Sequence, residues 1–96
     1  MSEKVEIENV NTPGRTTRVD RAKYDAMRAA LLRVLPDGEP GLTAAAATVA
    51  ATEHLPDDLF PGGKAAGWWQ KTVQLDLEAK GLVVRLPTKP LTFRRA

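Results

Sequence analysis

The chain has 96 residues, of which 43% are apolar and 27% are charged, and its formal net charge is +2 at pH 7. This size and composition predict one globular domain with a buried core and exclude a globally disordered chain. There is no cysteine and a single histidine, His54, which excludes disulfide scaffolds, thiolate zinc sites, cysteine nucleophiles and multi-histidine metal sites.

No apolar run approaches the ~20 residues that cross a bilayer, and no apolar segment follows the N-terminus as in a secretory signal. We therefore expect a cytoplasmic protein without a membrane partner. Charge is segregated along the chain, since residues 36–63 carry five acidic side chains and no Lys or Arg, whereas residues 79–96 carry five basic side chains and no acid. A basic segment suits an anionic partner such as a phosphate backbone, and it also suits a solvated surface.

Residues 1–19 are predicted to form an N-terminal extended arm or edge strand. Val5 and Ile7 alternate with polar residues, which is the period of a strand, and a turn cluster follows at residues 11–14. An unpaired edge strand invites pairing with another chain. Together with the nearly bare alanine helix expected at residues 44–51, this arm predicts a homodimer.

The remaining residues, 20–96, are predicted to contain three helices. These helices are expected over residues 20–35, 44–53 and 64–80. Asp20 and Thr43 are suited to accept hydrogen bonds from the free amides of a first helical turn, and Gly81 is typical of the position after a helix end.

After Gly81 the apolar period changes from helical spacing to alternation, which predicts a C-terminal hairpin over residues 82–94 with its turn at residues 87–90. The helical and alternating positions together give the expected core. Its members are Tyr24, Met27, Leu31, Leu35, Val49, Trp69, Val73, Leu77, Leu82, Val84, Leu91 and Phe93.

The order of these elements resembles a winged helix, a helix-turn-helix elaborated with a two-stranded wing. The most specific segment is Val73 to Val84, in which a third helix ending in Leu-Glu-Ala-Lys-Gly-Leu-Val leads directly into a strand. It is similar to the end of the recognition helix in many bacterial winged-helix regulators. The resemblance implies an α+β fold with three helices, a C-terminal wing hairpin and an added N-terminal arm.

The whole chain also resembles a family of small bacterial proteins of unknown function. The residues that carry this resemblance are Asn-Val-Asn-Thr-Pro-Gly at 9–14, Thr-Arg-Val-Asp at 17–20, Asp-Leu-Phe-Pro-Gly-Gly at 58–63 and Gly-Trp-Trp-Gln-Lys-Thr-Val-Gln-Leu-Asp-Leu-Glu-Ala-Lys-Gly at 67–81. Such a family supports the fold more than any activity.

The sequence gives little basis for catalysis. His54 follows Glu53 at the end of a helix, where the carbonyl dipole favours a histidine without any chemical role. The adjacent pair Asp57 and Asp58 could perform acid–base work, but loop carboxylates are more often capping or solvated groups. There is no phosphate-binding fingerprint. We expect a protein that is not an enzyme and has no metal, cofactor or small-molecule substrate.

Two functions remain open. The first is binding to double-stranded DNA, with the helix at 64–80 in the major groove and the wing at 85–95 on phosphates. The residues expected to contact DNA are Lys64, Gln70, Lys71, Gln74, Arg85, Lys89 and Arg94. The second is a protein–protein interaction or dimerisation module that binds no nucleic acid, which the acidic segment at 36–63 favours.

Two positions on the third helix have open alternatives. Trp69 shares the core face with Val73, whereas Trp68 falls on a second apolar strip. Trp68 either packs under a neighbouring loop or arm, or serves as an anchor for a partner, since exposed tryptophan is a frequent hot spot. Asp76 lies between the strips and needs a cationic partner, for which Arg28 or Arg21 from the first helix is expected.

Overall fold

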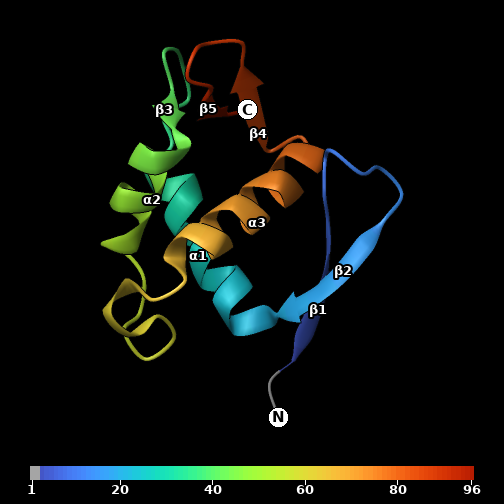
Figure 1. Ribbon diagram of the computed structural model, residues 1–96, viewed down its shortest axis with the longest axis vertical. Coiled ribbons are helices and arrows are strands. Elements are labelled where there is room, and N and C mark those ends of the chain that lie inside the picture. Colours follow the sequence, from blue (N-terminus) through green and yellow to red (C-terminus); the bar gives the residue numbers. More distant parts are fainter. Residues whose placement is uncertain (1–2) are drawn as a thin grey trace.

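Three helices and two small antiparallel sheets make up the fold of residues 3–96, the part of the chain that the computed structural model describes (Figure 1). The first two residues of the predicted arm lie outside this range. In chain order the elements are β1 (Lys4–Glu8), β2 (Thr16–Asp20), α1 (Arg21–Val34), β3 (Leu42–Thr43), α2 (Ala44–Thr52), the 3-10 turn η1 (Pro61–Gly63), α3 (Ala66–Ala79), β4 (Val83–Leu86) and β5 (Thr92–Arg95). The chain is thus a mixed α+β protein, as expected.

α1 and α2 begin where the capping residues predict. The Asp20 carboxylate accepts a hydrogen bond from the Lys23 amide at 3.0 Å, and the Thr43 hydroxyl accepts one from the Ala46 amide at 3.1 Å. These bonds satisfy amides that have no partner within the helix. α1 and α3 pack on each other and both pack on α2, so the three helices enclose one core.

The C-terminal sheet differs from the expected two-stranded wing. It has three antiparallel strands in the order β3-β5-β4, because Leu42 pairs with Phe93 and Thr43 with Thr92. Gly41 makes this pairing possible. Its φ is +73°, and a Cβ at this position would lie 2.6 Å from the Phe93 carbonyl oxygen. The short segment before α2 is therefore held close to the last strand.

Most of the predicted core is buried in the structure. The residues for which the prediction is confirmed are Tyr24, Met27, Leu31, Leu35, Trp69, Val73, Leu77 and Phe93. The prediction that Val49 belongs to the core is wrong, since 69% of this residue is exposed. α2 buries Ala47 and Ala51 instead, because small side chains let its backbone approach the other helices, and Val49 lies on the opposite side.

The alternation predicted after Gly81 is correct only for its last residues, since Leu86 is buried and Arg85 is exposed, as predicted. Leu82 still belongs to the turn that follows α3, where its amide donates to the Leu77 carbonyl at 2.9 Å. β4 therefore begins at Val83, and Val83 and Leu86 are buried. The expected core residues Leu82 and Leu91 are exposed, and Val84 is only half-buried.

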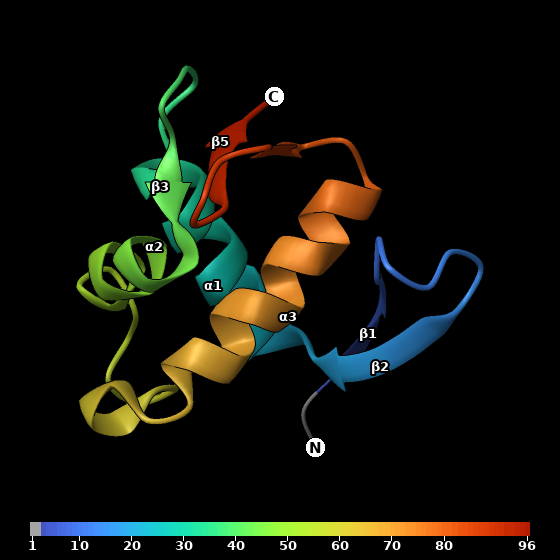
Figure 2. The same ribbon diagram turned by 45° about the horizontal axis from the view of Figure 1, so that its top comes forward.

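The N-terminal arm differs most from the prediction. It is not a lone edge strand, because β1 pairs with β2 of the same chain, with Val5 opposite Val19 and Ile7 opposite Thr17. Figure 2 shows this hairpin lying against α3, on the side opposite to α2. Pairing within the chain removes the unpaired arm, one of the two features on which the homodimer prediction rested, and dimerisation itself stays a prediction.

We expect Gly41→Ala to destabilise the fold by more than about 2 kcal/mol. A left-handed backbone costs an alanine roughly 1–2 kcal/mol, and the added methyl group also collides with the backbone of β5. Gly14→Ala is the matched control, because Gly14 has a φ of +85° and a Cβ added there would meet no atom within 4 Å. Urea midpoints of the two variants measure the difference, and equal losses would contradict the close β3–β5 approach.

Candidate functional site

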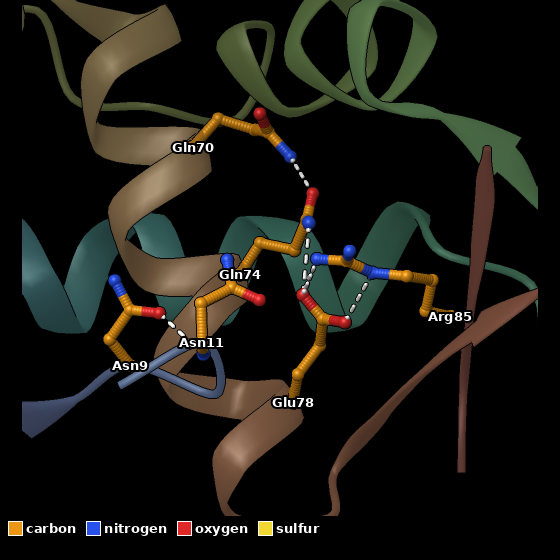
Figure 3. Close-up of polar contacts among 6 residues, drawn as sticks. All are labelled: Asn9, Asn11, Gln70, Gln74, Glu78 and Arg85. Atoms are coloured by element: carbon orange, nitrogen blue, oxygen red, sulfur yellow. Dashed lines mark hydrogen bonds and ion pairs between the residues drawn. The ribbon is translucent and has the colours of Figure 1, made fainter. Parts of the chain in front are cut away.

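The glutamines expected to read DNA bases are buried. Gln70 is 3% exposed and Gln74 is 5% exposed. Gln70 Nε2 donates to Gln74 Oε1 at 2.6 Å, and Gln74 Nε2 donates to Glu78 Oε2 at 3.1 Å (Figure 3). Arg85 closes the chain with Nε 2.9 Å from Glu78 Oε1. The expectation that Gln70 and Gln74 face a base edge is therefore wrong, because both side chains are buried and donate along α3, Gln70 to Gln74 and Gln74 to Glu78.

The basic C-terminal segment is largely neutralised by carboxylates from elsewhere in the chain. Lys80 pairs with Asp76, Arg85 with Glu78, and Arg95 lies 3.9 Å from Asp37. Arg94 is half-buried and donates to the carbonyl of Arg95 at 2.9 Å.

The expected DNA contacts that stay exposed, with no hydrogen bond or ion pair of the side chain among residues 3–96, are Lys64, Lys71 and Lys89. Lys71 lies on α3, Lys64 lies just before it, and Lys89 lies in the β4–β5 connection. The seven predicted residues thus do not form one free basic surface.

The carboxylates considered for acid–base chemistry have a local structural role. Asp57 Oδ1 accepts a hydrogen bond from the Gly62 amide at 3.0 Å, which fixes the loop before α3. Asp58 and His54 are exposed. Within residues 3–96 no group of three or more His, Cys, Asp or Glu side chains is arranged to hold a metal ion.

Asp76 is the most buried charged residue of the described chain, with an exposed fraction of 0%. Its carboxylate accepts hydrogen bonds from the Tyr24 hydroxyl, from Lys80 Nζ and, at 2.8 Å, from the Glu8 amide. The prediction of Arg21 or Arg28 as the partner was wrong, because the cation that pairs with Asp76 is Lys80, one turn along the same helix, while Arg21 lies beside Glu3 at 3.6 Å. Asp76 thereby joins β1, α1 and α3.

The buried Asp76 cluster changes the pKa of Tyr24. Burial raises the pKa of its hydroxyl above the ordinary value, and the hydrogen bond to Asp76 and the charge of Asp76 raise the pKa further. Arg28 acts in the opposite direction. Because the hydroxyl donates its proton to a buried carboxylate, ionising Tyr24 would put two negative charges in contact.

A groove of about 350 Å³ runs between α3 and the β1–β2 hairpin. Its lining combines apolar and hydrogen-bonding side chains from both elements. The residues that line it are Ile7, Glu8, Asn9, Thr12, Arg15, Thr16, Thr17, Val19, Trp68, Thr72 and Leu75. Such a volume is within the range of ordinary binding clefts, and its two ionisable side chains, Glu8 and Arg15, have opposite charges.

Trp68 forms the aromatic wall of the groove and is 57% exposed. Its ring lies edge-to-face on Trp69, with centroids 5.1 Å apart and an angle of 82°, while Trp69 itself is 8% exposed and meets Phe60. The buried ring therefore holds the exposed one in place. Of the two alternatives for Trp68, packing under a neighbouring loop or arm is wrong, since most of the side chain is exposed, and its role as a partner anchor stays a prediction.

Sequence reasoning missed the hairpin side of the groove. Arg15, Thr16 and Thr17 lie where only a turn and an arm were expected. A signal was present, since the segments 9–14 and 17–20 belong to the motifs that carried the family resemblance. Propensity alone could not place them opposite α3, because that depends on a contact between residues 8 and 76.

Fold and groove together define a small α+β domain with a groove between α3 and the β1–β2 hairpin. The chain belongs to a family of unknown function, DUF6958, whose model matches residues 4–93. No curated protein and no solved structure matched the chain. Among residues 3–96 no helix has the length and apolar character needed to cross a membrane.

We expect Asp76→Ala to lower the free energy of unfolding by about 3–5 kcal/mol, because it leaves a lysine and buried donors without their acceptor. Arg21→Ala removes an exposed pair at 3.6 Å and should cost less than about 1 kcal/mol. Denaturant titration compares the two variants. A loss below about 1 kcal/mol for Asp76→Ala would show that the cluster does not hold the fold together.

Stability should fall as the pH rises above about 10, the ordinary pKa of tyrosine. The native pKa of Tyr24 is raised, so the unfolded chain loses this proton first and unfolding becomes easier with pH, by up to about 1.4 kcal/mol per pH unit. Tyr24 is the single tyrosine, so tyrosinate absorbance reports it directly. Tyr24→Phe should lack this component, and an ordinary titration midpoint would contradict the raised pKa.

Proposed function

We propose that residues 21–95 adopt a winged-helix-type arrangement and that the protein is a non-enzymatic protein-interaction module. The element order α1-β3-α2-α3-β4-β5 supports the first part, because the short strand before α2 pairs with the last strand and the three helices pack together. The β1–β2 hairpin is then an addition to this arrangement. It replaces the isolated arm expected at residues 1–19.

The observation that carries the function is the exposure of Trp68 beside a groove. A tryptophan that is 57% exposed places a large apolar ring in water, which is costly unless a partner covers it. Trp69 fixes its orientation, so little conformational entropy is lost on binding. Tryptophan is also among the residues most enriched at the energetic centres of protein interfaces.

Duplex DNA binding is the second candidate. Three exposed cations, Lys64, Lys71 and Lys89, favour it. The burial of Gln70 and Gln74 speaks against direct base readout by α3. The segment after β1 also speaks against base readout. Its Val10 amide donates to the Leu75 carbonyl at 3.3 Å, so this segment covers part of the outer face of α3.

Replacing Trp68 should abolish partner binding. We expect proteins retained by the immobilised wild-type chain to be lost with Trp68→Ala, at a cost of at least about 30-fold in affinity, since truncation of a hot-spot residue costs about 2 kcal/mol or more. Val49→Ala is the matched control, because Val49 is the other strongly exposed apolar side chain, at 69%, and lies on α2. Quantitative mass spectrometry of the retained proteins measures both.

A titration against random duplex DNA at low salt tests the second candidate. Binding that weakens steeply with salt, and is reduced by Lys71→Ala and Lys89→Ala but not by Trp68→Ala, would favour DNA over a protein partner, because each phosphate contact releases a counterion. Retention of the same proteins by wild type and Trp68→Ala would also contradict the proposed function.

A further inference from the structure

The outer edge of β2 is an open hydrogen-bonding edge. β1 and β2 pair with residues 5 and 19 opposite each other and 7 opposite 17, and the Arg21 amide donates to the Glu3 carbonyl at 2.9 Å. The amides of Glu8 and Val10 point the other way, to Asp76 and Leu75. Since backbone groups alternate in direction along a strand, odd-numbered residues of the hairpin pair with each other and even-numbered ones point outward.

Thr16 and Arg18 therefore direct their N–H and C=O groups away from β1. No other described strand pairs with β2, and no backbone hydrogen bond within residues 3–96 reaches these groups across that edge. Such an edge is a template for an added strand.

β2 also borders the groove. Thr16, Thr17 and Val19 line it from β2, and Trp68 and Thr72 line it from α3. Thr17 and Val19 are two residues apart, so their side chains share one face of the hairpin. A strand added to β2 would present every second side chain on that face, which is the face turned toward Trp68.

We propose that an extended segment of another protein adds to the free edge of β2 as a third antiparallel or parallel strand, with one apolar side chain packed on Trp68. This inference rests on the proposed function and names the form that the partner takes. The outward backbone groups of Thr16 and Arg18 supply hydrogen bonds without regard to sequence, and Trp68 supplies selectivity.

Charge identifies the chemistry of the segment. Arg18, on the opposite face of β2, is exposed and has no ion pair among the described residues, so a carboxylate facing it across the new pair is favoured. β1, the strand already paired with β2, shows the same pattern, with apolar residues alternating with glutamates. A second copy of β2 fits poorly, because antiparallel pairing centred on Arg18 brings two arginines together. The occupant is an extended, acidic and apolar segment of a different protein.

Selection from a phage-displayed library of random peptides of about ten residues, the upper length of ordinary strands, tests the inference. We expect enriched peptides to alternate apolar and acidic residues and to bind Trp68→Ala at least about 30-fold more weakly. Arg18→Glu should select basic residues instead of acidic ones. Arg33→Glu is the matched control, because Arg33 is exposed near the end of α1, and it should leave the acidic preference unchanged.

Amide hydrogen exchange of the complex with a selected peptide then reports the backbone pairing. The amides of Thr16 and Arg18 should slow at least tenfold on binding, whereas those of Thr17 and Val19, already paired with β1, should change little. Peptides that need Trp68 but leave Thr16 and Arg18 unprotected would overturn strand addition and keep the proposed function. Absence of enrichment, or oligonucleotides that displace the peptides, would overturn the inference.

Discussion

The buried carboxylate of Asp76 is the interaction on which the rest of the structure depends. A charge without exposure to water is tolerated only when it is paired and hydrogen-bonded, and here residues from β1 and α1 and a lysine at the end of α3 satisfy it. These hydrogen bonds to Asp76 hold the β1–β2 hairpin against α1 and α3. The groove and the exposed position of Trp68 beside it follow from this placement, because both exist only where hairpin and α3 face each other.

Sequence periodicity is sufficient to predict an element when its buried residues recur at one regular spacing. The predicted ends of α1 and α3 lie within two residues of the observed ones, because the apolar spacing of both helices is regular, and Asp20 caps the start of α1. β2 was missed, because Thr16–Asp20 contains one apolar residue and becomes a strand through pairing with β1. The exposure of Val49 has a similar cause. In an alanine-rich helix the apolar pattern does not distinguish the buried side, and helix approach decides it.

Only part of the candidate site could be predicted from the sequence. Trp68 was identified, whereas the burial of the polar residues on α3 was not. The sequence identifies Trp68 as either packed or a partner anchor, and only the structure shows that the side chain is exposed beside the hairpin. Gln70, Gln74 and Glu78 are polar positions of the helical wheel, and a wheel treats polarity as exposure. Their spacing of four residues was the available signal, since side chains at that spacing can bond to one another. Whether such a row is then covered depends on Arg85 and the C-terminal sheet.

The separation of 68 residues between Glu8 and Asp76 has a consequence for synthesis of the chain. At ribosomal rates of about 5–20 residues per second, the hairpin, which is complete at Asp20, waits about 3–11 seconds until Asp76 of α3 has been added. During this interval its strands are an aggregation hazard for neighbouring nascent chains. The charged residues Lys4, Glu6 and Arg18 in these strands oppose aggregation in that period. The edge that we assign to a partner is therefore protected by charge before the domain exists.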